Sequence, residues 1–218
     1  MKRGSHSDST ERGHGDEPDD DTGARIDFAA LKPGVTKRFP SYLERYCTQK
    51  FHLVPPPGDS TGAPCEDQWV CQHSNKLVLV GVAQTHAIFA QKGAAGAARN
   101  IAAIDWTSSS SGADRQNMKV TGKGGRKGGV WVNPDSVLCT VTMDDGSTYR
   151  LRACIKGVLV EVNPRLVGEA GCVLLQQKAA TEGYLAVIRP KFEEARTCTT
   201  ALATREEYCS VRGVPLDS

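Results

Sequence analysis

The sequence predicts a mostly-β domain, built as an antiparallel sheet sandwich or a partly open barrel with a short helix at each end. Three observations lead to this prediction. Strand-length segments that alternate apolar and polar residues, or are continuously apolar, recur from residue 68 onward. Turn sequences such as Asp144-Asp145-Gly146 separate them. Sequences typical of helix starts occur near both ends of this region.

The N-terminal helix is expected at Ser41–Tyr46. Ser41 and Glu44 have the spacing of a capping box, in which each side chain pairs with the other residue's backbone N–H. The residues that would share one face of this helix are Tyr42, Leu43 and Tyr46. Residues Pro55–Gly58 are expected to end the element and to form a stiff connector.

The first β-hairpin is expected between residues 68 and 82. Gln68–His73 and Lys76–Val82 flank the pair Ser74-Asn75, and Asn75 is suited to the positive φ of a tight turn. Ile101–Trp106 is expected to be a third strand, with loops on either side of it.

The middle of the chain contains the clearest strand pattern. Val137–Met143 alternates strictly, and Asp144-Asp145-Gly146 is expected to turn the chain back. In the returning strand, Arg150 and Arg152 are expected on the face opposite to Tyr149, Leu151 and Ala153. The spacing therefore predicts a second hairpin with one apolar face.

Two further strands are expected before the C-terminal helix. The first is Ile155–Val162, and Asn163-Pro164 ends it. Its expected apolar face consists of Val158, Val160 and Val162. The second is the continuous apolar run Gly183–Ile188, which Pro190 follows and which is typical of a strand buried on both faces.

The C-terminal helix is expected to begin at a second capping box formed by Thr204 and Glu207. Gly213 and Pro215 provide the stop signal. The folded domain is therefore expected to span residues 41–213, with a short C-terminal tail at 214–218.

Residues 1–40 are expected to form a disordered acidic tail. Residues 1–25 carry four Lys or Arg and seven Asp or Glu, a net charge of −3, so the remaining chain carries +5. The start is charged and the apolar runs are strand-length, so we expect neither a secretory signal nor a membrane span. The eight cysteines form no CxxC pair and are expected to be reduced thiols of a nuclear or cytosolic protein.

A basic segment at residues 115–130 is the most unusual feature of the composition. It contains no acid, and its cations are Arg115, Lys119, Lys123, Arg126 and Lys127. The glycines at 122–129 are typical of phosphate loops, but Val130-Trp131 stands where a P-loop requires Lys-Ser/Thr. We therefore expect an electrostatic contact with an acidic surface, such as actin, nucleic acid or an acidic peptide. A loop with hydrated charges is the alternative.

Patterns for catalysis and metal binding do not emerge. The best candidate group of metal ligands consists of Cys65, Cys71, His73 and His86. The sequence spacing of these residues matches no known class of zinc site. The histidines beyond the tail have no partner motif for nucleophilic catalysis. We therefore predict a protein that is not an enzyme and that has no metal site and no cofactor.

Several blocks of the sequence match a known family. They are Tyr42-Leu43-x-Arg45-Tyr46, Cys65-Glu66-Asp67, Gln72-His73-Ser74-Asn75, Lys119-Val120-x-Gly122-Lys123, Asp145-Gly146-x-x-Tyr149, Gly157-x-Leu159-x-Glu161-Val162-Asn163, Thr181-Glu182-Gly183-Tyr184-Leu185-Ala186-Val187 and Pro190-Lys191-Phe192-Glu193-Glu194. On these blocks the chain resembles the Abitram family (actin-binding transcription modulator, also called Simiate) over about residues 41–211. It departs from the family by its acidic tail, its Pro-rich connector and the extra glycines at 124–129.

The resemblance implies a non-enzymatic adaptor that binds actin, influences filament assembly and modulates transcription. The implied locations are the nucleus and the cytoplasm, in association with the cytoskeleton. The implied partners are actin and nuclear or transcription-related proteins, while direct nucleic-acid binding stays open. No family rule fixes the actin-contact residues, so the basic segment is the expected contact on electrostatic grounds alone.

The Abitram family is in turn similar to the glycine cleavage H-protein, which has the lipoyl-like single-hybrid fold, a β-barrel-sandwich hybrid. Residues 157–163, residues 183–188 and the C-terminal helix resemble the second half of that carrier. Lipoyl transfer requires a lysine at the tip of the hairpin before Gly157. The tip here is Asp144-Asp145-Gly146, and Lys156 lies in the strand region instead. The resemblance therefore implies the carrier's scaffold without its lipoyl-lysine.

Two alternatives stay open at this point. The chain could be a degenerate lipoyl-carrier-like protein, or an accessory to lipoylated enzymes, and a lipoyl adduct in an intact-mass measurement would favour this. It could instead be a passive subunit of a larger assembly, with surface aromatics that contact neighbours. The candidate aromatics are Trp69, Trp106 and Trp131, although burial in the core is the simpler role for each.

Overall fold

The computed structural model describes residues 45–55, 64–90, 99–107 and 129–216. The chain divides into two units, Met1–Phe39 and Pro40–Ser218, and all the described residues belong to the second. The predicted acidic tail, the basic segment at 115–127 and most of the expected N-terminal helix and Pro-rich connector lie outside these residues. Of that helix only Arg45 and Tyr46 are described, and both are helical.

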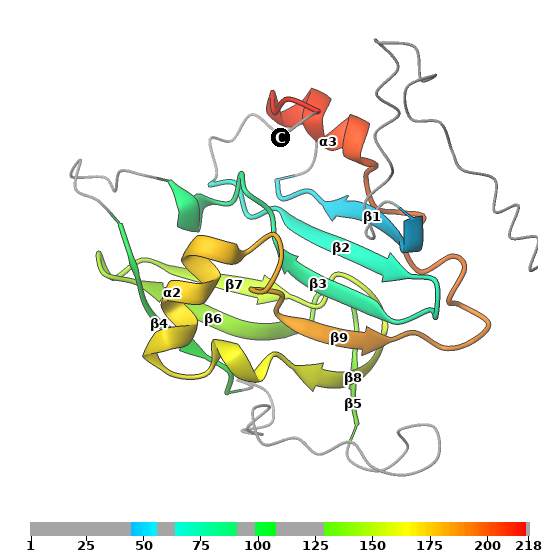
Figure 1. Cartoon of the computed structure of the whole chain (residues 1–218), viewed down its shortest axis with the longest axis horizontal. Coiled ribbons are helices and arrows are strands. Elements are labelled where there is room, and N and C mark those ends of the chain that lie inside the picture. Colours follow the sequence, from blue (N-terminus) through cyan, green and yellow to red (C-terminus); the bar gives the residue numbers. More distant parts are fainter. Residues whose placement is uncertain (1–44, 56–63, 91–98, 108–128, 217–218) are drawn as a thin grey trace, which may run out of the picture. The chain divides into compact units, whose positions relative to one another are not determined.

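Most strands of the described unit belong to one six-stranded antiparallel sheet with the order β1-β2-β3-β9-β8-β5 (Figure 1). The strands are β1 (Cys47–His52), β2 (Gln68–His73), β3 (Val78–Val82), β9 (Ala186–Arg189), β8 (Gly157–Val162) and β5 (Val130–Val132). All neighbours pair antiparallel. The chain thus places β9, a late strand, between the early strand β3 and β8.

A second antiparallel sheet has three strands, in the order β4-β6-β7. They are β4 (Ile101–Asp105), β6 (Val137–Met143) and β7 (Thr148–Arg152). The helical elements are η2 (Ala87–Phe89), η3 (Pro164–Leu166), α2 (Glu169–Lys178) and α3 (Arg205–Arg212). The prediction of a mostly-β domain made of antiparallel sheets with short helices is confirmed.

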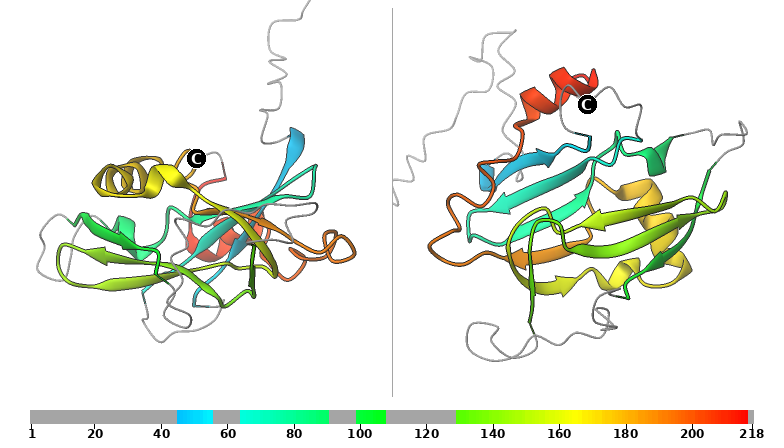
Figure 2. Two further views of the ribbon diagram at one scale, coloured as in Figure 1. Left: turned by 90° about the horizontal axis from the view of Figure 1, so that it is seen from below. Right: turned by 180° about the vertical axis from the view of Figure 1, so that it is seen from behind.

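The main core joins the two sheets. Val80 of β3, Leu159 of β8 and Ile188 of β9 belong to the same buried cluster as Val141 of β6 and Leu151 of β7. A helix contributes as well, because α2 packs beside β4 (Figure 2). A smaller cluster lies between β1, β2 and α3. In that cluster the rings of Phe51 and Tyr208 stack with centroids 3.9 Å apart, so α3 is fastened to the edge of the larger sheet.

The first hairpin lies where the sequence predicts it, but a different residue of its turn has the positive φ. Lys76 has φ 72°, and Asn75 is absent from the positive-φ residues of the described chain. The Asn75 side chain instead accepts a hydrogen bond from the backbone N–H of Leu77, at 2.9 Å. Asn75 therefore stabilises the turn through its amide oxygen, and the left-handed position falls one residue later.

The inward face of β8 differs from the expected one. Gly157 and Leu159 are buried, whereas Val158 and Val160 are only half-buried. The pairing with β9 shifts register between Leu159 and Glu161, and Val162 is buried again beyond the shift. The irregularity moves the alternation by one residue, so the expected face of Val158, Val160 and Val162 was wrong for the first two.

The segment Gly183–Ile188 also differs from its prediction. Regular strand structure starts only at Ala186, and β9 alternates between buried and half-buried residues. The continuous apolar run suggested burial on both faces, but Val187 and Arg189 are half-buried. The central place of β9 in the sheet, rather than full coverage, accounts for the apolar composition.

Helix α2 was not expected from the sequence. Its buried residues are only Gly171, Cys172 and Leu175, and Gly168 at its start makes no side-chain cap. A Cβ at Gly171 would lie 2.4 Å from the backbone oxygen of Leu166, so α2 packs too closely on η3 for any larger residue. Glycine inside a helix lowers intrinsic helix propensity, which is why the pattern concealed this element.

Helix α3 begins and ends as predicted. Thr204 accepts a hydrogen bond from the Glu207 backbone, and the Glu207 carboxylate accepts one from the Thr204 backbone. Gly213 takes the left-handed conformation with φ 66°. Among the described residues, no helix combines the length and the apolar character that crossing a membrane requires.

Gly81→Ala is expected to reduce the free energy of unfolding by about 1–3 kcal/mol, because added atoms in a close-packed core force neighbours to shift. A Cβ on Gly81 would lie 2.1 Å from the ring of Trp69. That ring is held in place, since its N–H donates to the Ala179 carbonyl at 3.1 Å. Urea unfolding measures the change, and Thr148→Ala on an exposed position of β7 is the control. Equal losses in the two variants would contradict the close contact.

Candidate functional site

The tip of the β6–β7 hairpin is the place where the carrier resemblance would put a modified lysine. The Met143 and Ser147 backbones close the turn, with a Met143 N–H to Ser147 oxygen distance of 2.9 Å. Gly146 has φ 81° and donates its N–H to the Met143 carbonyl at 3.0 Å. The turn over Asp144, Asp145 and Gly146 is therefore formed as the sequence predicts, and glycine is required for its left-handed position.

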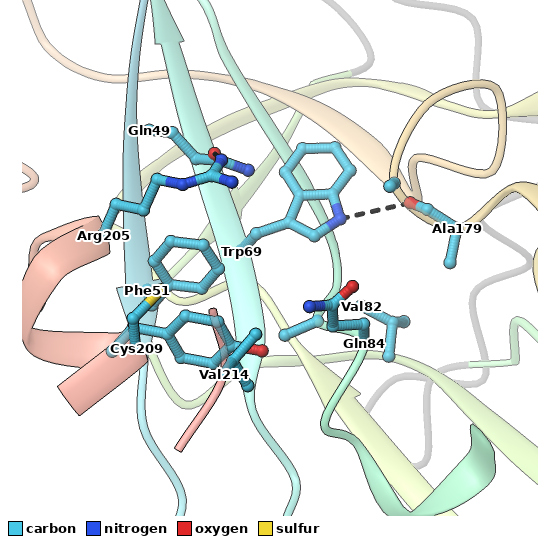
Figure 3. Close-up of a pocket in the computed structure, with 12 residues that line it drawn as sticks. Gln49, Phe51, Trp69, Val82, Gln84, Ala179, Arg205, Cys209 and Val214 are labelled. Carbon is cyan, nitrogen blue, oxygen red and sulfur yellow. Dashed lines mark hydrogen bonds between the residues drawn. The ribbon is translucent and has the colours of Figure 1, made fainter. Parts of the chain in front are cut away.

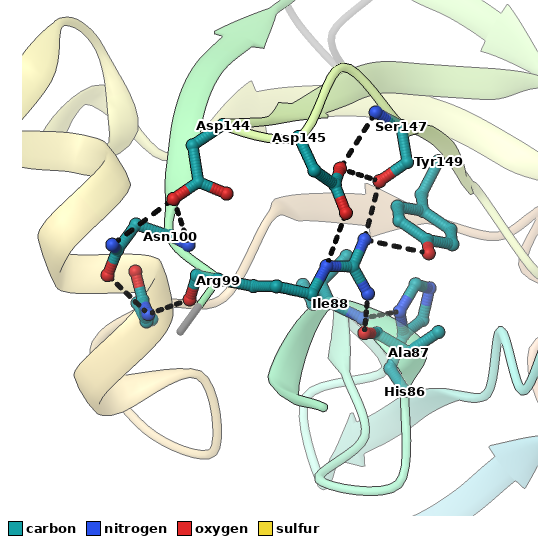
Figure 4. Close-up of polar contacts among 10 residues, drawn as sticks. His86, Ala87, Ile88, Arg99, Asn100, Asp144, Asp145, Ser147 and Tyr149 are labelled. Atoms are coloured by element: carbon teal, nitrogen blue, oxygen red, sulfur yellow. Dashed lines mark hydrogen bonds and ion pairs between the residues drawn. The ribbon is translucent and has the colours of Figure 1, made fainter. Parts of the chain in front are cut away.

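Arg99 holds this turn from the neighbouring segment (Figure 4). Its Nε lies 2.9 Å from Asp145 Oδ2. Its terminal nitrogens donate to the Ala87 carbonyl at 3.2 Å, to the Tyr149 hydroxyl at 3.1 Å and to the Ser147 hydroxyl. The Arg99 side chain is only 8% exposed. One guanidinium thus ties the residues before β4, the residues of η2 and the hairpin tip together.

Asp144 is engaged in a second set of contacts. Its carboxylate accepts from the Asn100 backbone N–H at 3.0 Å and from the Asn100 side chain at 3.3 Å. The Gln176 amide on α2 donates to the Arg99 carbonyl at 3.1 Å, and its oxygen accepts from the Ile101 N–H. Both carboxylates of the turn therefore have protein partners, and the turn is linked to α2.

The electrostatics of the turn favour the ionised form of Asp145. Hydrogen bonds from the Ser147 side chain and backbone, with Arg99 as a further contributor, lower the pKa of Asp145. Lys156, the nearest downstream lysine, precedes β8 and lies 3.5 Å from Glu194. The turn therefore presents two paired carboxylates and offers no amine for acylation.

His86 lies directly beneath this network. It is 1% exposed, and its Nδ1 accepts from the Ile88 N–H at 3.1 Å, so it caps η2. Its ring packs edge-on against Tyr149 with centroids 5.6 Å apart. Nε2 is buried without a hydrogen-bond partner among the described residues. Burial lowers the pKa of His86 to about 4, since a buried imidazolium loses its hydration.

A second polar network fastens the C-terminal helix. Asp67 is 0% exposed, and its carboxylate accepts two hydrogen bonds from Arg212, at 2.7 and 2.8 Å. It also accepts from the Val54 N–H, the Thr85 hydroxyl and the Cys65 thiol. Burial alone would raise the pKa of Asp67, but these hydrogen bonds outweigh it and lower the pKa.

Of the four residues weighed in the sequence as metal ligands, Cys65 and His86 take part in these networks. The Cys65 thiol bonds to Asp67, and His86 caps η2. Across the described ranges, no three His, Cys, Asp or Glu side chains are arranged to hold a metal ion. All eight cysteines lie in these ranges, and none forms a disulfide.

The cations of the predicted basic segment lie outside the described residues. The chain re-enters them at Gly129, which lies in a groove with Trp131 and Phe192. Trp131 is 42% exposed, whereas Trp69 and Trp106 are buried. The expectation of burial was therefore wrong for Trp131, because β5 is an edge strand of three residues that leaves this side chain uncovered.

A small pocket lies between β1, β2 and α3 (Figure 3). Its walls include Phe51, Trp69, Arg205 and Tyr208. Its volume is about 120 Å³, below the roughly 300 Å³ at which small-molecule sites begin. The pocket is therefore a packing defect around Trp69 rather than a place for a cofactor.

The fold and these sites define a two-sheet antiparallel β domain whose hairpin tip is held by one ion pair, between Arg99 and Asp145, and by hydrogen bonds. Curated proteins named Protein Abitram are similar to it. The zebrafish protein (Danio rerio) is 38% identical over 172 residues, which covers 79% of this chain and 89% of that protein. The human protein (Homo sapiens) is 34% identical over 169 residues, with coverages of 78% and 85%. The chain belongs to the Abitram family, as the sequence blocks predicted.

The family extends to a distant organism. The Protein Abitram of Dictyostelium discoideum is 30% identical over 174 residues, covering 80% of this chain and 89% of that protein.

No protein-family model matches the sequence. Among solved structures, a glycine cleavage system H protein from Mycobacterium marinum is similar with a TM-score of 0.42 and 18% identity, covering 75% of this chain and 91% of that chain.

Proposed function

We propose that this protein is a non-enzymatic adaptor of the Abitram type, which binds actin, influences filament assembly and modulates transcription. Its relationship to proteins named Abitram supports this proposal. The observation that carries it is the hairpin tip, where Asp144 and Asp145 are held by Asn100 and Arg99. A rigid tip of paired carboxylates suits a scaffold for binding and does not suit a swinging carrier arm.

The proposed actin contact is electrostatic. Five cations and no acid occur at residues 115–130, and opposite charge accelerates encounter with an acidic surface. The proposed sites of action are the nucleus and the cytoplasm, with actin and transcription-related proteins as partners. This assignment depends on composition, since the cations at 115–127 lie outside the described residues.

Replacing Lys123, Arg126 and Lys127 together by Gln is expected to weaken co-sedimentation with actin filaments about tenfold, since each surface ion pair contributes up to about 1 kcal/mol. The binding should also depend less steeply on salt than that of the unmodified protein. The matched control removes the same charge from exposed positions elsewhere and consists of Arg45→Gln, Arg150→Gln and Arg196→Gln.

Two results would contradict this proposal in different ways. Equal binding of the two triple variants would remove the basic segment as the contact, and no binding by the unmodified protein would remove actin as the partner. Intact-mass measurement of protein purified from its native cells tests the carrier alternative. A lipoyl adduct on any lysine would show that the protein carries an acyl group despite the lysine-free tip.

A further inference from the structure

A groove beside Trp131 and Phe192 combines cationic and apolar side chains on the surface of the larger sheet. We propose that it binds an extended acidic segment of a partner protein, with one large apolar side chain of that segment inserted between the charges. This inference goes beyond the proposed function, because it does not require the partner to be actin and does not involve the cations at 115–127.

The groove is formed by four segments that are far apart in sequence. They are the β2–β3 turn at residues 75–77, Gly129 with Trp131 of the edge strand β5, Val158 of β8, and the end of β9 with the following turns at 189–195. Figure 1 shows the chain after β9 beside the β2–β3 turn. The groove has a volume of about 720 Å³, which is enough for a large side chain together with its flanking backbone.

Two large aromatic side chains are exposed at this place. Phe192 is 90% exposed and Trp131 is 42% exposed. Aromatic residues of this size dominate the binding energy of many protein interfaces. Aliphatic side chains complete the apolar surface, since Leu77 and Val158 also line the groove. Burial of an apolar partner side chain against these residues would remove exposed apolar surface from water.

The charge of the groove determines that a partner segment should carry negative charge. The charged residues among its lining are Lys76, Arg189 and Lys191, all cationic. The acids that follow Phe192, Glu193 and Glu194, are outside the lining, and Glu194 lies 3.5 Å from Lys156. The lining therefore attracts Asp and Glu side chains and repels a basic segment.

The arrangement around Trp131 favours a protein segment over a nucleic acid. The Lys191 ammonium lies 5.3 Å from the centre of the Trp131 ring, over its face. A base could stack on Trp131 from that side only after displacing this lysine. β5 is also the last strand in its sheet, and its pairing among the described strands is with β8 alone. Its other edge can accept the backbone of an extended chain.

Tryptophan fluorescence reports on this groove selectively. The chain contains three tryptophans, and Trp69 and Trp106 are 6% and 1% exposed. Acrylamide therefore quenches chiefly Trp131. The probe is a synthetic peptide of sequence Glu-Asp-Glu-Leu-Phe-Asp-Glu-Asp, titrated into the full-length protein. Saturable protection of the quenchable fraction is expected, and Trp131→Phe should abolish the signal.

The variants separate the apolar from the charged contribution. Phe192→Ala is expected to weaken binding about tenfold, as for a central interface aromatic. Lys76→Glu combined with Lys191→Glu changes the charge of the lining from +3 to −1. This variant should weaken binding at least as much, and added salt should no longer reduce its affinity for the peptide. Val173→Ala, on α2 and 54% exposed, is the matched control and should leave binding unchanged. All these side chains lie on the surface, so the fold should persist in each variant.

Three outcomes would overturn the proposal. The first is the absence of protection at millimolar peptide. The second is equal binding by a peptide in which every acid is replaced by Lys. The third is tighter binding of single-stranded oligo-dT than of the acidic peptide, which would assign the groove to nucleic acid. A protein that fails to bind actin but binds the peptide would contradict only the proposed function.

Discussion

Asp67→Asn is expected to reduce the free energy of unfolding by about 3 kcal/mol, the lower end of the range for breaking a buried ion pair. The substitution keeps the shape of the side chain but removes the charge that Arg212 needs. Asp67 is 0% exposed and receives hydrogen bonds from Arg212, Val54, Thr85 and Cys65. The Arg212 side chain is 17% exposed, so water solvates part of the unpaired guanidinium and reduces the loss of stability.

Urea unfolding followed by circular dichroism measures this effect. The matched control is Glu182→Gln, which also removes a carboxylate from an ion-pair network. Glu182 contacts Arg165 and Lys178 at 2.6 Å, but its side chain is 38% exposed. Surface pairs contribute only about 0–1 kcal/mol, so this variant should be much less affected.

A double-mutant cycle shows whether the pair itself is responsible. Asp67→Asn with Arg212→Met removes both charges, so it should be more stable than the sum of the two single losses implies. Strict additivity of the two single effects would show that the residues act independently. That result would contradict the ion pair as the cause.

Acidification from pH 6.5 to pH 4 is expected to reduce stability by about 3 kcal/mol through His86 alone, the free energy that corresponds to lowering an ordinary pKa of 6.5 to about 4. The unfolded chain takes up a proton near pH 6.5, whereas folded His86 resists it until about pH 4. The stabilisation is therefore complete above pH 6.5 and is lost as the pH falls toward 4. Asp67, with its lowered carboxyl pKa, contributes to the loss only in more acidic solution.

His86→Asn provides the control for this pH dependence. Asn is a preferred helix-capping residue, so its side-chain oxygen can replace Nδ1 as the acceptor of the Ile88 N–H. Unfolding free energies measured from pH 4 to pH 8 should show a smaller slope in the variant. Part of the slope should persist, since burial, followed by the charge of Arg152, also lowers the pKa of His52. An unchanged slope would exclude His86 as the titrating group.

The sequence predicted those elements whose local signals agree with their tertiary roles. The β6–β7 hairpin has strict alternation and a turn that requires Gly146, and α3 has both its cap at Thr204 and its stop at Gly213. These signals act within a few residues, so they can be recognised without knowledge of the fold. The same reasoning did not find α2, whose Gly171 serves close packing on Leu166 rather than helix propensity.

The networks around the sites could not be predicted in the same way. Asp67 and Arg212 are separated by 145 positions, and no spacing rule links them. Arg99 is likewise a single cation whose partners lie at 87, 145, 147 and 149. Phe192 is preceded by Lys191 and followed by two glutamates. This charged sequence context indicates only weakly that the phenylalanine side chain is exposed.

The contact between Asp67 and Arg212 has a consequence for how the chain is made. Synthesis proceeds from the N-terminus, so β2 leaves the ribosome long before α3 does. Until Arg212 emerges, a nascent domain would have to keep the Asp67 carboxylate in water or protonate it. Phe51, which stacks on Tyr208, also lacks its partner until α3 has been synthesised. The edge strand β1 can thus reach its final place only once α3 has been translated.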